Sequence, residues 1–141
     1  MVKLREMMSS DLPNVLSWRN QEAVRKNMYT THVISAEEHL RWWESQKNNV
    51  RTIPLVAEME ERPVGVVIFS NYAGVNGIAT WAFYAAEGAQ KGVGRAMERA
   101  ALDYAFQVLK VRKLECEVLS FNMPVVKLHL RHGFEVEGVF K

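Results

Sequence analysis

The spacing of hydrophobic residues changes along this chain, and each spacing predicts a different kind of element. Residues 2–7 alternate apolar with charged side chains, which predicts a half-buried strand. After Asp11, apolar residues recur three and four positions apart, which predicts a helix that Asp11 caps and that holds Pro13 in its first turn. A second short helix is expected over residues 22–27.

The next helical segment begins with a recognisable N-terminal signal. Ser35, followed three residues later by Glu38, forms a capping box, in which each side chain bonds the backbone N–H of the other residue. This signal predicts a helix through Gln46, with Leu40 and Trp43 on its apolar side.

Beyond residue 50 the period becomes that of strands. Residues 52–58 and 63–70 are expected to form a hairpin joined by the charged turn 59–62. A further strand is expected over 78–85, after the turn formed by residues 74–77. These three segments predict the centre of a sheet.

The strongest helical pattern lies in residues 94–109. Its apolar residues at helical spacing are Ala96, Met97, Ala100, Ala101, Tyr104 and Val108. A strand over 113–119, a helix over 124–132 and a last strand over 134–140 are expected to follow. The order of these elements is that of an α+β fold, with a central sheet flanked by helices.

Length, charge and composition exclude several classes of protein. A chain of 141 residues suffices for one core, so we expect a single domain over residues 1–141. Eighteen basic and sixteen acidic residues give a formal net charge of +2, and no basic stripe is interleaved with aromatics, so a nucleic-acid partner is not expected. The sequence shows no bilayer-spanning apolar stretch and no signal-peptide core, so we expect a cytoplasmic protein without a membrane partner.

Cysteine and histidine usage adds two expectations. Cys116 is the only cysteine, so no internal disulfide can form, which suits a reducing compartment. It alternates with Glu115 and Glu117 and is therefore expected to be a buried packing residue, not a nucleophile. The four histidines and the scattered acids show no metal-ligand spacing, so no metal is expected.

The junction between the 78–85 strand and the strong helix carries the most informative motif. Gly92 and Gly94 allow a tight turn whose N–H groups point the same way, and the helix adds the positive end of its dipole. Lys91, Arg95 and Arg99 add positive charge. The expected ligand is therefore a phosphate, and a pyrophosphate in particular.

Two common phosphate loops do not fit this motif. A P-loop requires Lys and then Ser or Thr after the second glycine, where Arg95 and Ala96 stand. A dinucleotide-binding fingerprint requires a third glycine where Met97 stands.

The motif resembles the acetyl-CoA loop of the Gcn5-related N-acetyltransferase (GNAT) family, which reads Arg or Gln, two residues, Gly, one residue, Gly or Ala. Gly92 and Gly94 match the glycine positions, while Ala89 stands at the first position and Gln90 one place later. The segment from Asn122 to Phe134 resembles the family's C-terminal motif. The resemblance implies acetyl-CoA as acetyl donor, held by Phe83, Tyr84, Ala85, Gln90, Lys91, Gly92, Val93, Gly94, Arg95, Ala96, Asn122, Val125 and Leu128.

The resemblance also implies a catalytic arrangement. The family has a mixed, mostly antiparallel sheet that splays between its fourth and fifth strands, where a backbone N–H of residues 83–85 would polarise the thioester carbonyl. Tyr84 lies at this point, either in the sheet core or as a wall of the acyl site. A further strand normally follows the one at 134–140, whereas this sequence stops at Lys141, so we expect a sheet without that C-terminal strand. Either the product is shortened, or a neighbouring chain supplies the strand, or the strand is absent.

His129 falls where many relatives have a tyrosine that protonates the departing thiolate. An imidazole with the ordinary pKa of about 6.5 is mostly neutral at pH 7, so His129 would donate as a neutral N–H or need a raised pKa. The alternative is a histidine on a helix surface. For the general base, Glu58, His39 and a water relay stay open.

The first third of the chain resembles the nucleotide-sugar branch of the family, in its Trp18-Arg19-Asn20 and Glu37-Glu38-His39-Leu40 words. The implied acceptor is the 4-amino group of a UDP-linked dideoxy aminosugar of pseudaminic acid biosynthesis, a route that serves flagellin glycosylation. Such an acceptor needs cations for its diphosphate and a flat surface for uracil. The residues assigned to it are Arg19, Asn20, Met28, His39 and Trp42.

Two other functions stay open on the sequence. The Trp-Arg-Asn word also occurs in relatives that acetylate ribosomal-protein N-termini, which would place acidic residues near the amine. A non-catalytic acyl-CoA-binding domain would agree with Ala89 and His129 at positions where the family pattern differs. The edge of the last strand would also allow a homodimer.

Overall fold

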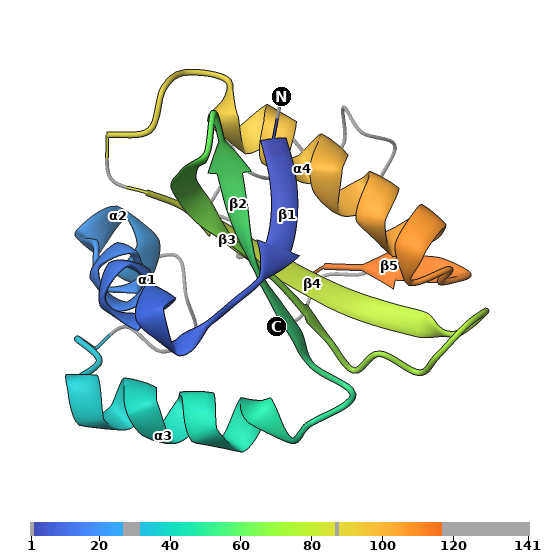
Figure 1. The fold of residues 1–141 in the computed structure, drawn as a ribbon, viewed down its shortest axis with the longest axis horizontal. Helices are drawn as coiled ribbons and strands as arrows, with labels where there is room; N and C mark the ends of the chain where they lie inside the picture. The colour runs from blue at the N-terminus through green and yellow to red at the C-terminus, as the bar shows by residue number, and fades with distance from the viewer. Residues whose placement is uncertain (1, 27–31, 87, 117–141) are drawn as a thin grey trace.

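A computed structural model describes residues 2–26, 32–86 and 88–116 of the chain. It contains one five-stranded sheet in the order β1-β2-β3-β4-β5 (Figure 1). The strands are β1 (Val2–Glu6), β2 (Ile53–Met59), β3 (Arg62–Ser70), β4 (Ile78–Ala85) and β5 (Lys113–Glu115). The helices are α1 (Leu12–Arg19), α2 (Glu22–Arg25), α3 (Ala36–Lys47) and α4 (Val93–Asp103), with a 3₁₀ turn at Ser9–Asp11 and a π-helical turn at Tyr104–Val108.

The sheet is mixed and mostly antiparallel, as the family resemblance implied. The first four strands pair antiparallel with their neighbours, and β5 runs parallel to β4. Within the described residues the β4–β5 ladder runs only from Ile78 opposite Lys113 to Thr80 opposite Glu115. The second half of β4, which leads to the predicted phosphate loop, therefore lies beyond this ladder.

The β2–β3 hairpin closes through a two-residue turn. Met59 pairs with Arg62, so Glu60 and Glu61 are the turn residues, as the charged segment 59–62 predicted. Both have positive φ, +52° and +65°, which is the geometry of the type I′ turn. This turn matches the right-handed twist of the strands, although its residues are not the usual Asn and Gly.

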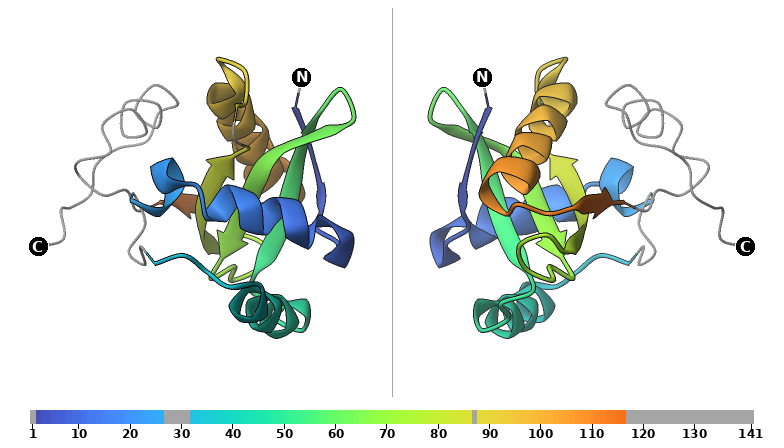
Figure 2. Two further views of the ribbon diagram at one scale, coloured as in Figure 1. Left: turned by 90° about the vertical axis from the view of Figure 1, so that its left-hand side faces the viewer. Right: turned by 90° about the vertical axis from the view of Figure 1, so that its right-hand side faces the viewer.

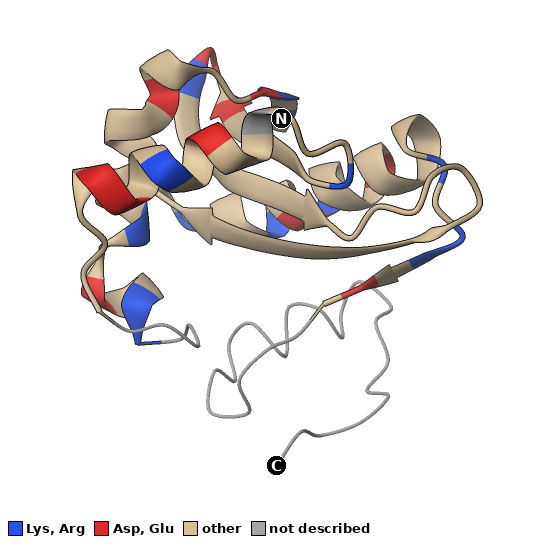
Figure 3. Ribbon diagram, turned by 90° about the horizontal axis from the view of Figure 1, so that it is seen from below, with Lys and Arg blue, Asp and Glu red and all other residues tan. Residues whose placement is uncertain are grey.

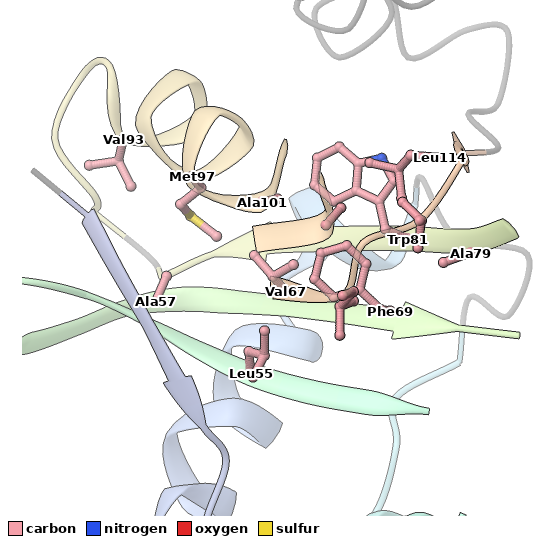
Figure 4. Close-up of a cluster of buried hydrophobic side chains, with 13 residues drawn as sticks. Leu55, Ala57, Val67, Phe69, Ala79, Trp81, Val93, Met97, Ala101 and Leu114 are labelled. Carbon is pink, nitrogen blue, oxygen red and sulfur yellow. The ribbon is translucent and has the colours of Figure 1, made fainter. Parts of the chain in front are cut away.

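Helices cover both faces of the sheet. In Figure 2, α1 crosses in front of the sheet in one view and α4 in the opposite view. The face under α4 is the larger core, in which Met97 and Ala101 of the helix meet Ala57, Val67 and other strand residues (Figure 4). The other face packs against α1 and α3 through a separate buried cluster of Met7, Val15, Trp18, Trp43, Val56 and Val66.

Gly65 in β3 permits the close approach of α4. A Cβ at this position would lie 2.6 Å from Cε of Met97 and 2.7 Å from the carbonyl oxygen of Tyr84. Since neither distance is tolerated by a real side chain, glycine lets Met97 seat directly over the sheet. This contact sets the height of α4, and thus of its N-terminus, above β4.

Three expectations about side chains were wrong in detail. Asp11 does precede α1, but its carboxylate accepts hydrogen bonds from the Met8 N–H and from Arg5, and none from the first turn of α1. Leu40 is 50% exposed, whereas His39 is buried because it lies one turn before Trp43, on the side of α3 that packs against α1. Val108 is exposed because the π-helical turn shifts the register of the stripe, whose last members are Ala105 and Leu109.

Other expectations were confirmed closely. The strand 78–85 has the predicted bounds, the hairpin and the first strand agree to within about a residue, and Ser35 accepts a 3.1 Å hydrogen bond from the Glu38 N–H as a capping box requires. The end of the 113–119 strand, the 124–132 helix and the 134–140 strand lie outside the described residues.

Candidate active site

The N-terminus of α4 has the backbone geometry on which the prediction of an anion site rests. Gly92 is the N-cap residue and has φ +93°, a left-handed conformation that a side chain would strain. The first bond of the helical ladder runs from the Ala96 N–H to the Gly92 carbonyl at 3.0 Å. The N–H groups of Gly94 and Arg95 precede that bond, so the helix offers them no acceptor.

The surroundings of this turn suit a negatively charged ligand. The Lys91 and Arg95 side chains are exposed, and the first turn of α4 holds no acidic residue. A Cβ on Gly92 would meet nothing within 4 Å, so the space over the turn is open. Arg99 is turned to Asp103, 3.7 Å away, and contributes less than the sequence suggested. The residues present fit a pyrophosphate, held mainly by backbone N–H groups.

Successive backbone N–H groups at the end of β4 point alternately toward β3 and away from it. The Ala86 N–H bonds the Val64 carbonyl of β3 at 2.7 Å. Because hydrogen-bonding direction alternates along a strand, Tyr84 also directs its N–H toward β3, whereas Phe83 and Ala85 direct theirs to the opposite side. The Ala85 N–H therefore points away from β3, toward the side where a ligand could bind beyond the β4–β5 ladder. The Tyr84 N–H points toward β3 and is not available to such a ligand.

The Tyr84 side chain lies on the face covered by α1 and α3. Burial raises the pKa of its phenol, and the nearby Arg19 charge opposes this only in part. Tyr84 therefore stays protonated at neutral pH and is able to donate a hydrogen bond on this face of the sheet. Phe83 points to the other face, where its ring stacks on that of Trp81 with centroids 5.3 Å apart.

Arg19, His39 and Trp42 come together on the same face of the sheet. The pKa of Arg19 is lowered by burial, with an opposing influence of Tyr84 and a further lowering by the positive charge of Arg25. The pKa of His39 is lowered by burial and then by Arg19, so its imidazole is neutral at pH 7. The ring of Trp42 stacks on His39 with centroids 5.3 Å apart and an angle of 14°. The cluster combines positive charge, a neutral imidazole and a flat indole.

Asn20 directly follows Arg19, and both polar atoms of its side-chain amide form hydrogen bonds with the backbone. Its Oδ1 accepts from the Ile34 N–H and its Nδ2 donates to the Ile34 carbonyl, both at 2.8 Å. Asn20 therefore fastens the segment before α3 to the end of α1. Its assignment to the acceptor stays a prediction, and the contacts seen give it a positioning role.

The sequence reasoning missed Gln21, the next residue along. Its Nε2 donates to the Trp18 carbonyl at 2.8 Å and to the Ala85 carbonyl at 3.0 Å. No sequence signal identifies this contact, because Gln21 and Ala85 are 64 residues apart.

The surroundings of Glu58 and Cys116 favour structural roles for both side chains. Glu58, a candidate base, forms an ion pair with Arg5 at 3.1 Å. Burial, followed by the charge of Glu98, raises the pKa of the Cys116 thiol to about 11, which agrees with a packing role. Within residues 2–26, 32–86 and 88–116, no group of His, Cys, Asp and Glu is arranged to hold a metal ion.

The charges of α3 are mixed in sign, as Figure 3 shows along that helix. Glu37 pairs with Arg41 at 3.7 Å, and Glu38 with His32 at 3.0 Å.

No helix in the described part of the chain is both long and apolar enough to cross a membrane. His129, Asn122, Val125, Leu128 and Met28 lie outside the described residues, so their assignments stay predictions.

Comparison with known proteins identifies the fold independently. Residues 2–135 match the model of the acetyltransferase (GNAT) domain family. The acetyltransferase PseH of Campylobacter jejuni is 29% identical over 139 residues, which cover 96% of this chain and 86% of that protein.

Solved structures show the same architecture. Campylobacter jejuni PseH in complex with acetyl coenzyme A superposes with a TM-score of 0.78 at 24% identity, over 100% of this chain and 93% of that one. Spermidine N-acetyltransferase of Vibrio cholerae, in complex with CoA and spermine, has a TM-score of 0.88 at 23% identity, over 97% and 82%. At these identities the likeness concerns the fold.

Proposed function

Because the chain belongs to the acetyltransferase (GNAT) family, it transfers an acetyl group from acetyl-CoA to an amine, and we propose that this amine is the 4-amino group of a UDP-linked dideoxy aminosugar. The observation that carries the proposal is the position of Arg19, a partly buried guanidinium close to Tyr84, His39 and Arg25, while Nε of Arg25 donates to the Asn20 carbonyl at 2.9 Å. Burial and the neighbouring charge of Arg25 disfavour the charged form of Arg19, and an anion such as a diphosphate bound beside it would stabilise that charge.

The donor would be held at the N-terminus of α4. The N–H groups of Gly94 and Arg95 and the side chains of Lys91 and Arg95 suit its pyrophosphate, with Gln90, Val93 and Ala96 beside them. When bound, acetyl-CoA supplies the activated thioester. The Ala85 N–H is directed away from β3 and would donate to the thioester carbonyl, which increases its reactivity toward an amine.

The acceptor would enter from the side of α1 and α3. Arg19 and Arg25 suit the diphosphate, and the indole of Trp42 offers a flat surface for uracil. The neutral imidazole of His39 suits removal of a proton from the acceptor ammonium group, directly or through water. Glu58 is less suited because Arg5 already engages its carboxylate. We retain His129 as the group that would protonate the thiolate.

The charges also discriminate between acceptor classes. A polyamine or a peptide N-terminus is a cation and favours carboxylates around the amine, whereas Arg19 and Arg25 favour an anionic acceptor. The sequence relative PseH, whose name belongs to the pseudaminic acid route, supports the same choice.

Release of free thiol from acetyl-CoA tests the proposal when it is measured with three acceptors. These are UDP-4-amino-4,6-dideoxy-N-acetyl-altrosamine, a panel of N-terminal peptides and spermidine. We expect turnover with the UDP-aminosugar only. Turnover with a peptide or with spermidine alone would refute it, and binding of CoA without thiol release for any amine would show a non-catalytic acyl-CoA-binding domain.

Substitution of Arg19 tests the acceptor assignment. Arg19→Met should raise the KM for the UDP-aminosugar by about tenfold or more while the KM for acetyl-CoA changes less than about twofold. Arg51→Met, an exposed arginine beyond α3, is the matched control and should change neither. An equal effect of Arg19→Met on both substrates would contradict the assignment.

A further inference from the structure

The end of β4 is held on its open side by a side chain. Ala85 directs its carbonyl away from β3, toward the side where β5 pairs with the start of the same strand. Within the described residues, the group that donates to the Ala85 carbonyl is the side-chain nitrogen of Gln21, 3.0 Å away. Gln21 therefore supplies a hydrogen bond to β4 beyond the described β4–β5 ladder.

Gln21 is itself held firmly. Its backbone N–H donates to the Trp18 carbonyl at 3.3 Å, and its carbonyl accepts from the N–H groups of Val24 and Arg25 at 3.0 and 2.8 Å. Its side-chain nitrogen also donates to Trp18 at 2.8 Å. Because Gln21 is the N-cap residue of α2, these bonds lock the corner between α1 and α2.

The two elements joined by Gln21 carry different groups of the proposed reaction, those that would bind the acceptor and the one that would bind the thioester carbonyl. The α1–α2 corner carries Arg19 and Arg25, and the end of β4 carries the Ala85 N–H. In an extended strand the N–H and C=O of one residue point to the same side, so a bond that holds the Ala85 carbonyl also holds the direction of its N–H.

From these contacts we propose that Gln21 is a positioning residue for acetyl transfer. It fixes the Ala85 peptide so that its N–H is aimed at the thioester carbonyl, and it sets the distance between the acceptor-binding corner and that N–H. This inference rests on the acetyl transfer proposed above, but not on the identity of the acceptor. Small errors in such a distance cost rate more than binding.

Gln21→Met tests the proposal, because methionine has a similar length and no donor. We expect kcat to fall about tenfold, which corresponds to about 1.4 kcal/mol, while the KM and the dissociation constant for acetyl-CoA change less than about twofold. The assay uses whichever amine the wild-type enzyme acetylates, at a temperature where both proteins are fully folded. Gln107→Met, an exposed glutamine in the π-helical turn, is the matched control and should leave kcat unchanged.

Hydrogen exchange gives a readout that does not depend on turnover. Without any ligand, peptides that cover residues 80–86 should exchange about tenfold faster in Gln21→Met than in wild type, and peptides of the β2–β3 hairpin should not. Gln21→Glu provides a pH profile. Its carboxylate cannot donate at pH 8, and its protonated form can, so its kcat relative to wild type should rise as the pH falls.

These readouts separate the two proposals. Failure of the wild-type enzyme to acetylate the UDP-aminosugar would overturn the acceptor assignment and leave the exchange and acetyl-CoA measurements in place. A kcat of Gln21→Met within twofold of wild type, or unchanged exchange at residues 80–86, would overturn the role of Gln21.

Discussion

Arg5 and Asp11 form a two-point salt bridge in which Nη1 and Nη2 of the arginine each lie 2.8 Å from a carboxylate oxygen. The Asp11 side chain is 9% exposed, and the same carboxylate accepts a 2.8 Å hydrogen bond from the Met8 N–H. Arg5 also reaches Glu58 at 3.1 Å. This cluster ties β1 and β2 to the turn that leads into α1, which carries Arg19 at its end.

The first prediction is a loss of stability in acid. The hydrogen bond from Arg5 is the largest of the influences that lower the pKa of Asp11, although burial opposes it. The unfolded carboxyl has a pKa of about 3.9. Because the folded pKa is lower, the contribution of Asp11 to the free energy of unfolding is complete above the unfolded value and is lost as the pH falls through the folded value.

Asp11→Asn should therefore lower the free energy of unfolding at pH 7 by about 1–3 kcal/mol and reduce its decline below about pH 4. Urea unfolding measured at several pH values between about 3 and 7 gives both effects, because this range includes the unfolded pKa of about 3.9. Glu37→Gln, which breaks the exposed pair with Arg41, should cost less than about 0.5 kcal/mol. Equal costs for the two substitutions would contradict the importance of burial.

The second prediction concerns the Gly92 turn. Gly92→Ala places a Cβ at φ +93°, which should cost about 1–2 kcal/mol of stability and distort the turn that directs the N–H groups of Gly94 and Arg95. Calorimetry should show the dissociation constant for acetyl-CoA raised about tenfold, since charge-assisted bonds are lost.

Gly88→Ala is the matched control for the Gly92 turn, because Gly88 also has positive φ, +74°, and open space around its Cα. It should lower stability by a similar amount and leave the affinity for acetyl-CoA nearly unchanged. If both substitutions weaken acetyl-CoA binding equally, the loop as a whole and not the Gly92 turn determines affinity.

The third prediction is a gain in stability at the β2–β3 turn. Replacement of Glu60 and Glu61 by Asn and Gly suits their positive φ values and should raise the free energy of unfolding by about 0.5–1 kcal/mol. The double change to Gln removes the two charges without changing the backbone preference and should gain much less. A larger gain from Gln than from Asn-Gly would show that charge repulsion, not backbone strain, limits this turn.

The fourth prediction concerns Cys116. With a pKa raised to about 11, its thiol is almost fully protonated at pH 8. Relative to an ordinary cysteine of pKa about 8.5, its alkylation should be slower by roughly 200-fold at that pH, and the rate should still rise tenfold per unit up to about pH 10. Mass spectrometry after iodoacetamide treatment measures the rate without ambiguity, since the chain has one cysteine. A rate that levels off near pH 8.5 would contradict the raised pKa.

The features predicted correctly depend on residues close together in the chain. The capping box of Ser35 and Glu38 is a contact over three residues, and the alternation in 78–85 expresses the pleat of a single strand. The turn conformation of Gly92 is likewise a local property. For this reason the sequence by itself determined the central elements, the glycine turn at the start of α4 and, through its motifs, the family.

The features predicted wrongly or missed depend on how distant elements meet. Which side of α3 packs against α1 decides that His39 is buried and Leu40 is exposed. Val108 is exposed because of a π-helical turn that the spacing of apolar residues does not predict. The bond of Gln21 to the Ala85 carbonyl joins residues 64 positions apart. Only the tertiary structure decided these, because the burial of a side chain and the partner of a backbone carbonyl are set by the packing of the sheet and helices, and not by neighbours in the chain.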